Sequence, residues 1–269
     1  MSGRVLLAYC FVFTEPTMRL PTSPAPIAIL SALAEEQSGL LEALVDRHEV
    51  VQGGRSYWCG QLYGQPVVLA LSRIGKVAAA TTATALISHF GVQAMLFTGV
   101  AGGLAAGVRV GDVVVADGLL QHDMDASPLF SRYEVPLLGR SVFSTDAALT
   151  QQLQRACALA LDALILPGSR PAVHSGLVVS GDRFVSGTAE AATLVGNLQR
   201  AGYAPLAVEM EGAAVAQVCF DYGVPLALVR TISDRADDDA HHDFPAFVKE
   251  VASVYARAIV QFWLELLPK

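Results

Sequence analysis

The sequence alternates between short apolar runs and longer helix-like runs from about residue 26 to the C-terminus. Most of the short runs are continuously apolar and bounded by Gly or Pro, which is typical of strands buried on both faces of a sheet. The predicted strands are residues 27–33, 94–99, 111–120, 174–181, 205–210 and 224–233, together with a hairpin over 56–72. The predicted helices are residues 75–91, 146–161, 189–202, 211–223 and 244–267.

This order of elements constrains the fold, because parallel strands need crossover connections and helices usually supply them. It predicts an α/β fold with a central mixed, mostly parallel β-sheet flanked by helices on both faces. No internal repeat or linker follows Pro26, so residues 26–269 are predicted to form one domain. Residues 1–25 are predicted to be a leader outside this core, because their apolar run lacks a small-residue cleavage site and Met18 offers a second start.

Charge and composition exclude several classes of function. The formal net charge of -7 gives no basic surface for nucleic acid. Although 53% of the residues are hydrophobic, charges or Gly interrupt each run before a membrane-spanning length of about 18 residues. The four cysteines are scattered without a C-x-x-C pair, which favours reduced thiols over a disulfide framework. The sequence therefore predicts a cytoplasmic enzyme that acts on a small molecule.

Chemistry is expected at the carboxyl ends of the strands, where loops and backbone N–H groups converge in α/β folds. Adjacent acids, Glu35 and Glu36, follow the first predicted strand, and Asp234 follows the last. One of the adjacent acids can stabilise a helix N-terminus while the other faces a cleft as a general base. Asp234 is equally compatible with a helix N-cap, and the Gly-rich turn over residues 98–103 with a plain tight turn.

A second pair of acids, Glu209 and Glu211, stands where a predicted strand passes into a helix. If the strand continues through Met210, the two carboxylates project to the same side. A carboxylate in this position can accept hydrogen bonds from two neighbouring hydroxyls, such as those of a ribose.

No metal site is predicted. One candidate set is His241, His242 and Asp243, and the other is His122, Asp123 and Asp125, but neither has a recognised ligand spacing.

Seven segments in the same order resemble 5′-methylthioadenosine/S-adenosylhomocysteine nucleosidases of the nucleoside phosphorylase superfamily. They are "AILSALAEE", "IGKVAAA", "TGVAGGL", "VGDVVVADGLLQHDMD", "VVSGDRF", "AVEMEGAAVAQVC" and "VRTISDRAD". The resemblance runs from about Ile27 to the C-terminus. It implies hydrolysis of an N-glycosidic bond, release of adenine and a 5-thioribose product, and a role in methionine salvage and S-adenosylhomocysteine recycling. It also implies a homodimer that needs no metal or organic cofactor.

The resemblance assigns roles to the acidic residues. Glu36 matches the carboxylate that activates the attacking water, and Asp234 matches the acid that protonates the purine at N7. Met210 and Glu211 match the residues that hold the ribose, and Glu209 has a less direct role. These residue types fit the chemistry, because C–N cleavage leaves positive charge on the sugar and negative charge on the base.

The remaining substrate contacts are also implied by the resemblance. Phe184 matches the aromatic residue that stacks on adenine, Val185 the residue whose backbone reads the base, and Gly102 part of the turn beside the sugar. The residues that match the lining of the 5′-thio pocket are Leu33, Ile74 and Phe244. Ser233 and Arg230 complete the expected substrate-binding set, with Arg230 near the water.

One departure from the family pattern is visible at Val100, where a Ser that helps to place the nucleophile is usual. A phosphate-dependent purine nucleoside phosphorylase is disfavoured, because the carboxylates of Glu35 and Glu36 repel phosphate. An aminodeoxyfutalosine nucleosidase and a non-catalytic nucleoside-binding module remain alternatives to the predicted nucleosidase.

Overall fold

The structure, a computed structural model, describes residues 25–164, 170–237, 240, 244 and 247–268. The predicted leader and the His241–Asp243 set therefore lie outside the described residues, apart from Ala25. The strands are β1 (Ile27–Ser31), β2 (Val45–Gln52), β3 (Arg55–Leu62), β4 (Gln65–Leu71), β5 (Ala94–Gly103), β6 (Val113–Gln121), β7 (Val142–Ser144), β8 (Val173–Ser180), β9 (Pro205–Glu209) and β10 (Leu226–Asp234). The helices are α1 (Ala34–Gln37), α2 (Leu40–Ala43), α3 (Lys76–Ser88), α4 (Ala147–Ala163), α5 (Thr188–Arg200), α6 (Gly212–Tyr222), the π-helical turn η1 (Val248–Ala252) and α8 (Ser253–Leu266).

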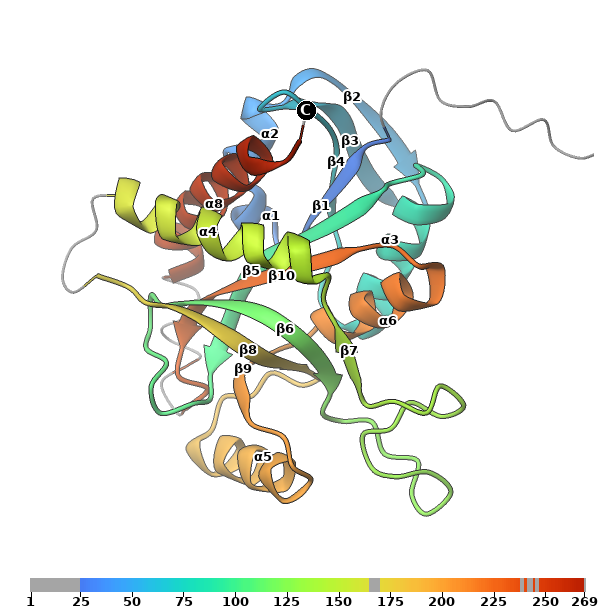
Figure 1. Cartoon of the computed structure of the whole chain (residues 1–269), viewed down its shortest axis with the longest axis vertical. Helices are drawn as coiled ribbons and strands as arrows, with labels where there is room; N and C mark the ends of the chain where they lie inside the picture. Colours follow the sequence, from blue (N-terminus) through green and yellow to red (C-terminus); the bar gives the residue numbers. More distant parts are fainter. Residues whose placement is uncertain (1–24, 165–169, 238–239, 241–243, 245–246, 269) are drawn as a thin grey trace, which may run out of the picture.

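The strands form one mixed sheet, which confirms the predicted α/β fold (Figure 1). Its order is β10-β6-β8-β9-β5-β1-β4-β3-β2, and β10 also pairs with β5. The strands β5, β9, β8, β6 and β10 therefore form a closed circuit of pairings, from which β1, β4, β3 and β2 extend as an open arm. The central strand β5 is buried along its whole length, as its continuous apolar sequence predicts.

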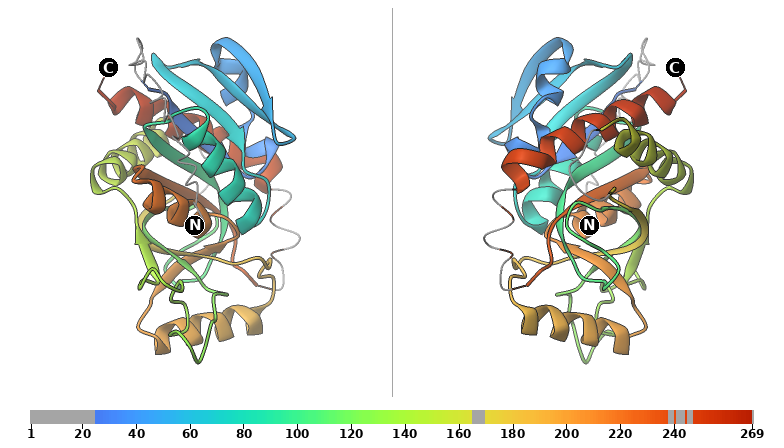
Figure 2. Two further views of the ribbon diagram at one scale, coloured as in Figure 1. Left: turned by 90° about the vertical axis from the view of Figure 1, so that its right-hand side faces the viewer. Right: turned by 90° about the vertical axis from the view of Figure 1, so that its left-hand side faces the viewer.

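Two hydrophobic cores lie on opposite faces of the sheet, because successive strand side chains alternate in direction. In β1, Ala28 and Leu30 belong to the core that contains residues of α3 and α6, whereas Ile27 and Ile29 belong to the core that contains residues of α4 and α8. A third cluster packs α5 against the β8 and β9 strands. Two further views show the helices on both sides of the sheet (Figure 2).

Local differences from the predicted elements have identifiable causes. The β2 strand was not predicted, because almost all of its residues are exposed and it carries no apolar alternation. The predicted strand over 205–210 ends at Glu209, one residue early, because α6 begins at Gly212. The predicted helix over 244–267 contains the π-helical turn η1, which a 3.6-residue periodicity does not reveal.

No helix in the described part of the chain is long and apolar enough to span a membrane. Of the cysteines within that part, Cys59, Cys157 and Cys219 are free thiols.

Candidate active site

A cavity of about 310 Å³ opens where loops after several strands converge. Every residue that the sequence assigned to catalysis or substrate binding lines this cavity, except Arg230. The assigned residues that line it are Leu33, Glu36, Ile74, Gly102, Phe184, Val185, Glu209, Met210, Glu211, Ser233, Asp234 and Phe244. They come from segments far apart in the sequence, brought together by β1, β4, β5, β8, β9 and β10. Sequence reasoning did not assign Ala32, Ala101, Arg183 and Val208, which also line the cavity.

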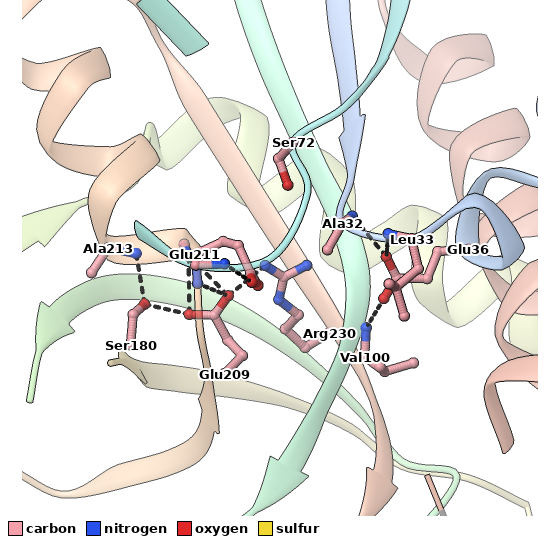
Figure 3. Close-up of polar contacts among 12 residues, drawn as sticks. Ala32, Leu33, Glu36, Ser72, Val100, Ser180, Glu209, Glu211, Ala213 and Arg230 are labelled. Atoms are coloured by element: carbon pink, nitrogen blue, oxygen red, sulfur yellow. Dashed lines mark hydrogen bonds and ion pairs between the residues drawn. The ribbon is translucent and has the colours of Figure 1, made fainter. Parts of the chain in front are cut away.

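Glu36 lines the cavity, and three backbone N–H groups donate hydrogen bonds to its carboxylate (Figure 3). Its Oε2 accepts hydrogen bonds from the backbone N–H groups of Ala32 and Leu33 at 2.8 and 2.9 Å. Its Oε1 accepts from the Val100 N–H at 3.0 Å. Burial raises the pKa of Glu36, and the positive charge of Arg230 and the three backbone donors oppose that rise. The neighbouring Glu35 is exposed, so one carboxylate serves both the α1 terminus and the cavity.

Arg230 lies behind the cavity wall rather than on it. Its Nη2 atom is 2.5 Å from Glu209 Oε2, and its guanidinium stacks 4.1 Å from the centroid of the Phe97 ring. It also approaches Glu36 across Gly99, where an added Cβ would lie 2.5 Å from Arg230 Nη1 and 2.8 Å from Glu36 Oε1. Arg230 is therefore a buried counter-charge shared by two carboxylates.

Glu209, the first of the paired acids, is held by contacts within the protein. Its carboxylate accepts from the backbone N–H groups of Glu211 and Gly212 at 3.1 and 2.8 Å. It also accepts from the hydroxyl of Ser180 and pairs with Arg230. These contacts occupy both oxygens with the start of α6 and the core, so Glu209 fixes the turn that carries Met210 and Glu211 (Figure 3).

Glu211 does not share the side of Glu209 in the way predicted for a continuous strand, because the strand ends before it. Its backbone, with φ of -135° and ψ of -40°, begins α6. Its Oε1 accepts from the Gly75 N–H at 2.8 Å. Burial, followed by the negative charge of Glu209, raises the pKa of Glu211. This raised pKa, about 8, favours the protonated form of Glu211 at neutral pH.

Replacing Glu211 with Gln is expected to stabilise the ligand-free protein increasingly as the pH rises above about 4.5. In the parent, the unfolded chain loses the Glu211 proton above its ordinary pKa while the folded protein retains it, so the free energy of unfolding falls with pH. Glutamine removes this loss and keeps an acceptor for Gly75. Thermal melts of both proteins at pH 5 and pH 8 should show the Tm of the variant rising relative to the parent, by about 3–8 °C at pH 8. A Tm difference that does not change with pH would contradict the raised pKa of Glu211.

Asp234 ends β10 and is 2% exposed. Its Oδ2 accepts from the Ser233 hydroxyl and its Oδ1 from the Ala236 N–H, each at 2.8 Å. An added Cβ at Gly102 would lie 2.9 Å from Asp234 Oδ1, so glycine gives this carboxylate room beside the β5 backbone. Asp234 is thus a carboxyl group positioned against the cavity by a neighbouring hydroxyl and a backbone donor.

Aromatic and aliphatic side chains form the rest of the cavity wall. Phe184 is 42% exposed, and its ring centroid lies 5.6 Å from that of Phe244 in an edge-on arrangement. Val185, beside it, is buried. Val100 forms an apolar cluster with Val248 and Ala252. Leu33, Phe244 and Phe247 pack against this cluster, so at this position an aliphatic side chain joins the cavity wall to the start of the C-terminal helix.

In the His122, Asp123 and Asp125 set, Asp123 makes an ion pair and a backbone hydrogen bond. Asp123 pairs with Lys76 at 2.5 Å and accepts from the Asp182 N–H at 2.9 Å. Within the described ranges, no three His, Cys, Asp or Glu side chains gather in an arrangement that could hold a metal ion.

The fold and the cavity together define a class of α/β protein in which strand ends surround a cavity lined by buried carboxyl groups and aromatic side chains. The chain matches the model of the phosphorylase superfamily over residues 26–267, and it belongs to that superfamily.

Several relatives are similar along most of their length. The aminodeoxyfutalosine nucleosidase of Helicobacter pylori is 36% identical over 232 residues, which cover 86% of this chain and 94% of the relative. The 5′-methylthioadenosine/S-adenosylhomocysteine nucleosidase of Neisseria meningitidis, solved with methylthio-immucillin-A, has a TM-score of 0.82 at 34% identity and covers 91% of this chain and 100% of its own. The S-adenosylhomocysteine nucleosidase of Streptococcus pyogenes, solved with 5-methylthiotubericidin, has a TM-score of 0.81 at 32% identity. The match covers 93% of this chain and 100% of the relative.

Substituting Gly99 with Ala is expected to lower both the stability and the activity of the protein. The added methyl group would press on Arg230 and Glu36, which are both buried and cannot move away freely. Overpacking of this kind typically costs about 1–3 kcal/mol. Denaturant unfolding measures the loss of stability, and nucleoside cleavage measures the loss of activity. Gly107→Ala is the matched control, because a Cβ there meets nothing within 4 Å. Equal behaviour of the two variants would contradict the close approach at Gly99.

Proposed function

We propose that the protein is a nucleosidase that hydrolyses the N-glycosidic bond of 5′-methylthioadenosine and S-adenosylhomocysteine and releases adenine. The observation that carries this proposal is that Glu36 and Asp234, two buried carboxyl groups, line one cavity together with Glu211. The similarity to nucleosidases over most of the chain supports the reaction type.

In the proposed mechanism, one carboxyl group acts as a general acid and the other as a general base. Asp234 donates a proton to N7 of the purine, so that the base leaves without a full negative charge. Glu36, once deprotonated, accepts a proton from a water molecule that attacks the anomeric carbon of the sugar. The backbone donors of Ala32, Leu33 and Val100 fix the orientation of the Glu36 carboxylate for this task.

The other residues bind and orient the nucleoside in this proposal. Glu211 accepts hydrogen bonds from the ribose hydroxyls, and Met210 packs beside the sugar. Phe184 stacks on the adenine ring, and the backbone of Val185 reads its edge. The raised pKa of Glu211 is compatible with ribose binding. Two hydroxyl donors favour the charged form of its carboxyl group once the substrate is bound.

Hydrolysis is favoured over phosphorolysis by the charge of the cavity. The described lining includes Glu36, Glu209, Glu211 and Asp234, and only Arg183 supplies a positive charge there. Arg183 pairs with Glu190 at 2.8 Å. A phosphate dianion in this setting would meet carboxylates rather than unpaired cations.

An aminodeoxyfutalosine nucleosidase is the second candidate, because a protein of that name is 36% identical to this chain. The test of both candidates is adenine release from 5′-methylthioadenosine, S-adenosylhomocysteine and aminodeoxyfutalosine in phosphate-free buffer. We expect turnover of the two thio-nucleosides and no acceleration on adding phosphate. Turnover of aminodeoxyfutalosine alone would support the second candidate, and an absolute requirement for phosphate would support a phosphorylase.

We also propose a cytoplasmic homodimer. Two aliphatic side chains between β6 and β7, Leu129 and Leu137, are 84% and 90% exposed and would be covered by a second copy. Sedimentation of the purified protein tests the oligomeric state, and a monomer at micromolar concentration would contradict it.

A further inference from the structure

A surface groove of about 410 Å³ continues from the active-site cavity. Ile74 lines both the cavity and the groove, so the two spaces meet at this side chain. The next residue, Gly75, also lines the groove and donates its N–H to Glu211. A substituent that leaves the ribose past Ile74 therefore enters the groove directly.

The groove carries one cation, Arg55 at the start of β3. Among the hydrogen bonds of the described residues, its guanidinium makes one, from Nη1 to the carbonyl of Gly53 at 3.3 Å. Its Nε atom is buried and has no acceptor, and none of the described ion pairs includes Arg55. Arg183, by contrast, is already paired with Glu190. A buried guanidinium donor without an acceptor favours binding of a carboxylate.

The groove also carries one anion, Asp182. Its Oδ1 accepts from the Lys76 N–H at 2.7 Å, and this oxygen would lie 3.1 Å from a Cβ added at Gly75. The Asp182 carboxylate thus stands against the backbone next to Ile74, while Arg55 contributes to the same groove. Two opposite charges beside one passage match a ligand that itself carries both charges.

We propose that this groove binds a zwitterionic amino-acid tail attached at the 5′ position of the nucleoside, with Arg55 receiving the carboxylate and Asp182 the ammonium group. The proposal rests on the proposed nucleosidase function and makes Arg55 and Asp182 specificity residues of the same site. A methylthio group ends near Ile74 and makes neither contact. A homocysteinyl tail extends farther and makes both, so the two residues act on S-adenosylhomocysteine and not on 5′-methylthioadenosine.

The test is a comparison of kcat/KM for the two nucleosides in charge-neutralising variants. Arg55→Gln is expected to lower kcat/KM for S-adenosylhomocysteine about five- to fiftyfold through KM, with the value for 5′-methylthioadenosine within twofold of the parent. Asp182→Asn keeps the acceptor for Lys76 and should act in the same direction. Arg55→Lys should restore part of the loss. Arg155→Gln is the matched control, because it removes one exposed positive charge on α4.

A third nucleoside separates the two charges. A 5′-thioadenosine with a simple carboxyalkyl tail should depend on Arg55 but not on Asp182. Equal losses for both natural nucleosides, or no loss for S-adenosylhomocysteine, would overturn the assignment while 5′-methylthioadenosine turnover still upheld the proposed function. If the parent cleaved neither nucleoside, the proposed function and the tail site that rests on it would both fail.

Discussion

Replacing Asp234 with Asn is expected to lower the turnover number for adenine release by about 10²–10⁴-fold while the protein stays folded. The amide is nearly isosteric: its oxygen can still accept from the Ala236 N–H and its NH2 can donate to the Ser233 hydroxyl oxygen, so the local structure of β10 is preserved. It cannot donate a carboxylic proton to the leaving purine. Steady-state adenine release measures the loss, and circular dichroism checks the fold.

Two controls sharpen this prediction. Asp117→Asn removes an exposed carboxylate on β6 and should leave turnover unchanged. A 5′-methylthioribosyl substrate whose leaving group departs as a stable anion should be cleaved almost equally by the parent and by Asp234→Asn, since it needs no acid. Adenine release by the Asp234 variant within threefold of the parent would remove Asp234 from the acid role.

Replacing Glu36 with Gln is expected to lower kcat by about 10²–10⁴-fold and to change KM little, because its proposed partner is water rather than the nucleoside. The two substitutions should also differ in their pH profiles. Burial raises the pKa of Glu36, so the parent should lose activity as the pH falls through that raised pKa and the base becomes protonated. The residual activity of Glu36→Gln should lack this acidic limb.

Glu35→Gln is the matched control for this substitution, because Glu35 precedes Glu36 in α1 and is exposed. It removes the same charge without touching the cavity and should keep both kcat and the acidic limb. A Glu36→Gln effect confined to KM would argue against a role in activating water.

Much of the fold could be predicted from local sequence patterns. The apolar run of β5 and the alternation of strand-like and helix-like segments predict strands buried on both faces between helices. The β2 strand escaped prediction because it is an exposed edge strand whose residues need no apolar pattern. The pairing of β10 with both β5 and β6 was also not predicted, because three-dimensional packing and not local composition determines which strands pair.

The candidate site was predictable to the extent that strand ends concentrate ligand contacts and that the motifs resemble one family. Glu36, Asp234 and Glu211 were singled out by their positions after strands or at the start of a helix, and the resemblance assigned their roles. The resemblance gave Glu211 the ribose and Glu209 a less direct role, but the residue pattern could not show what physically separates the two acids. That separation depends on Arg230 and Ser180, which reach Glu209 from other strands.

The sequence by itself determined the order of strands and helices, the apolar faces that bury them and the acids at their ends, because each of these depends on neighbouring residues along the chain. Tertiary structure alone decided that the pKa values of Glu36 and Glu211 are raised, because burial sets this shift and the charge of Arg230 opposes it. It also decided that Arg55 and Asp182 line one groove beside Ile74. Electrostatic interactions act across space, and only the folded chain brings such distant residues close enough for them to operate.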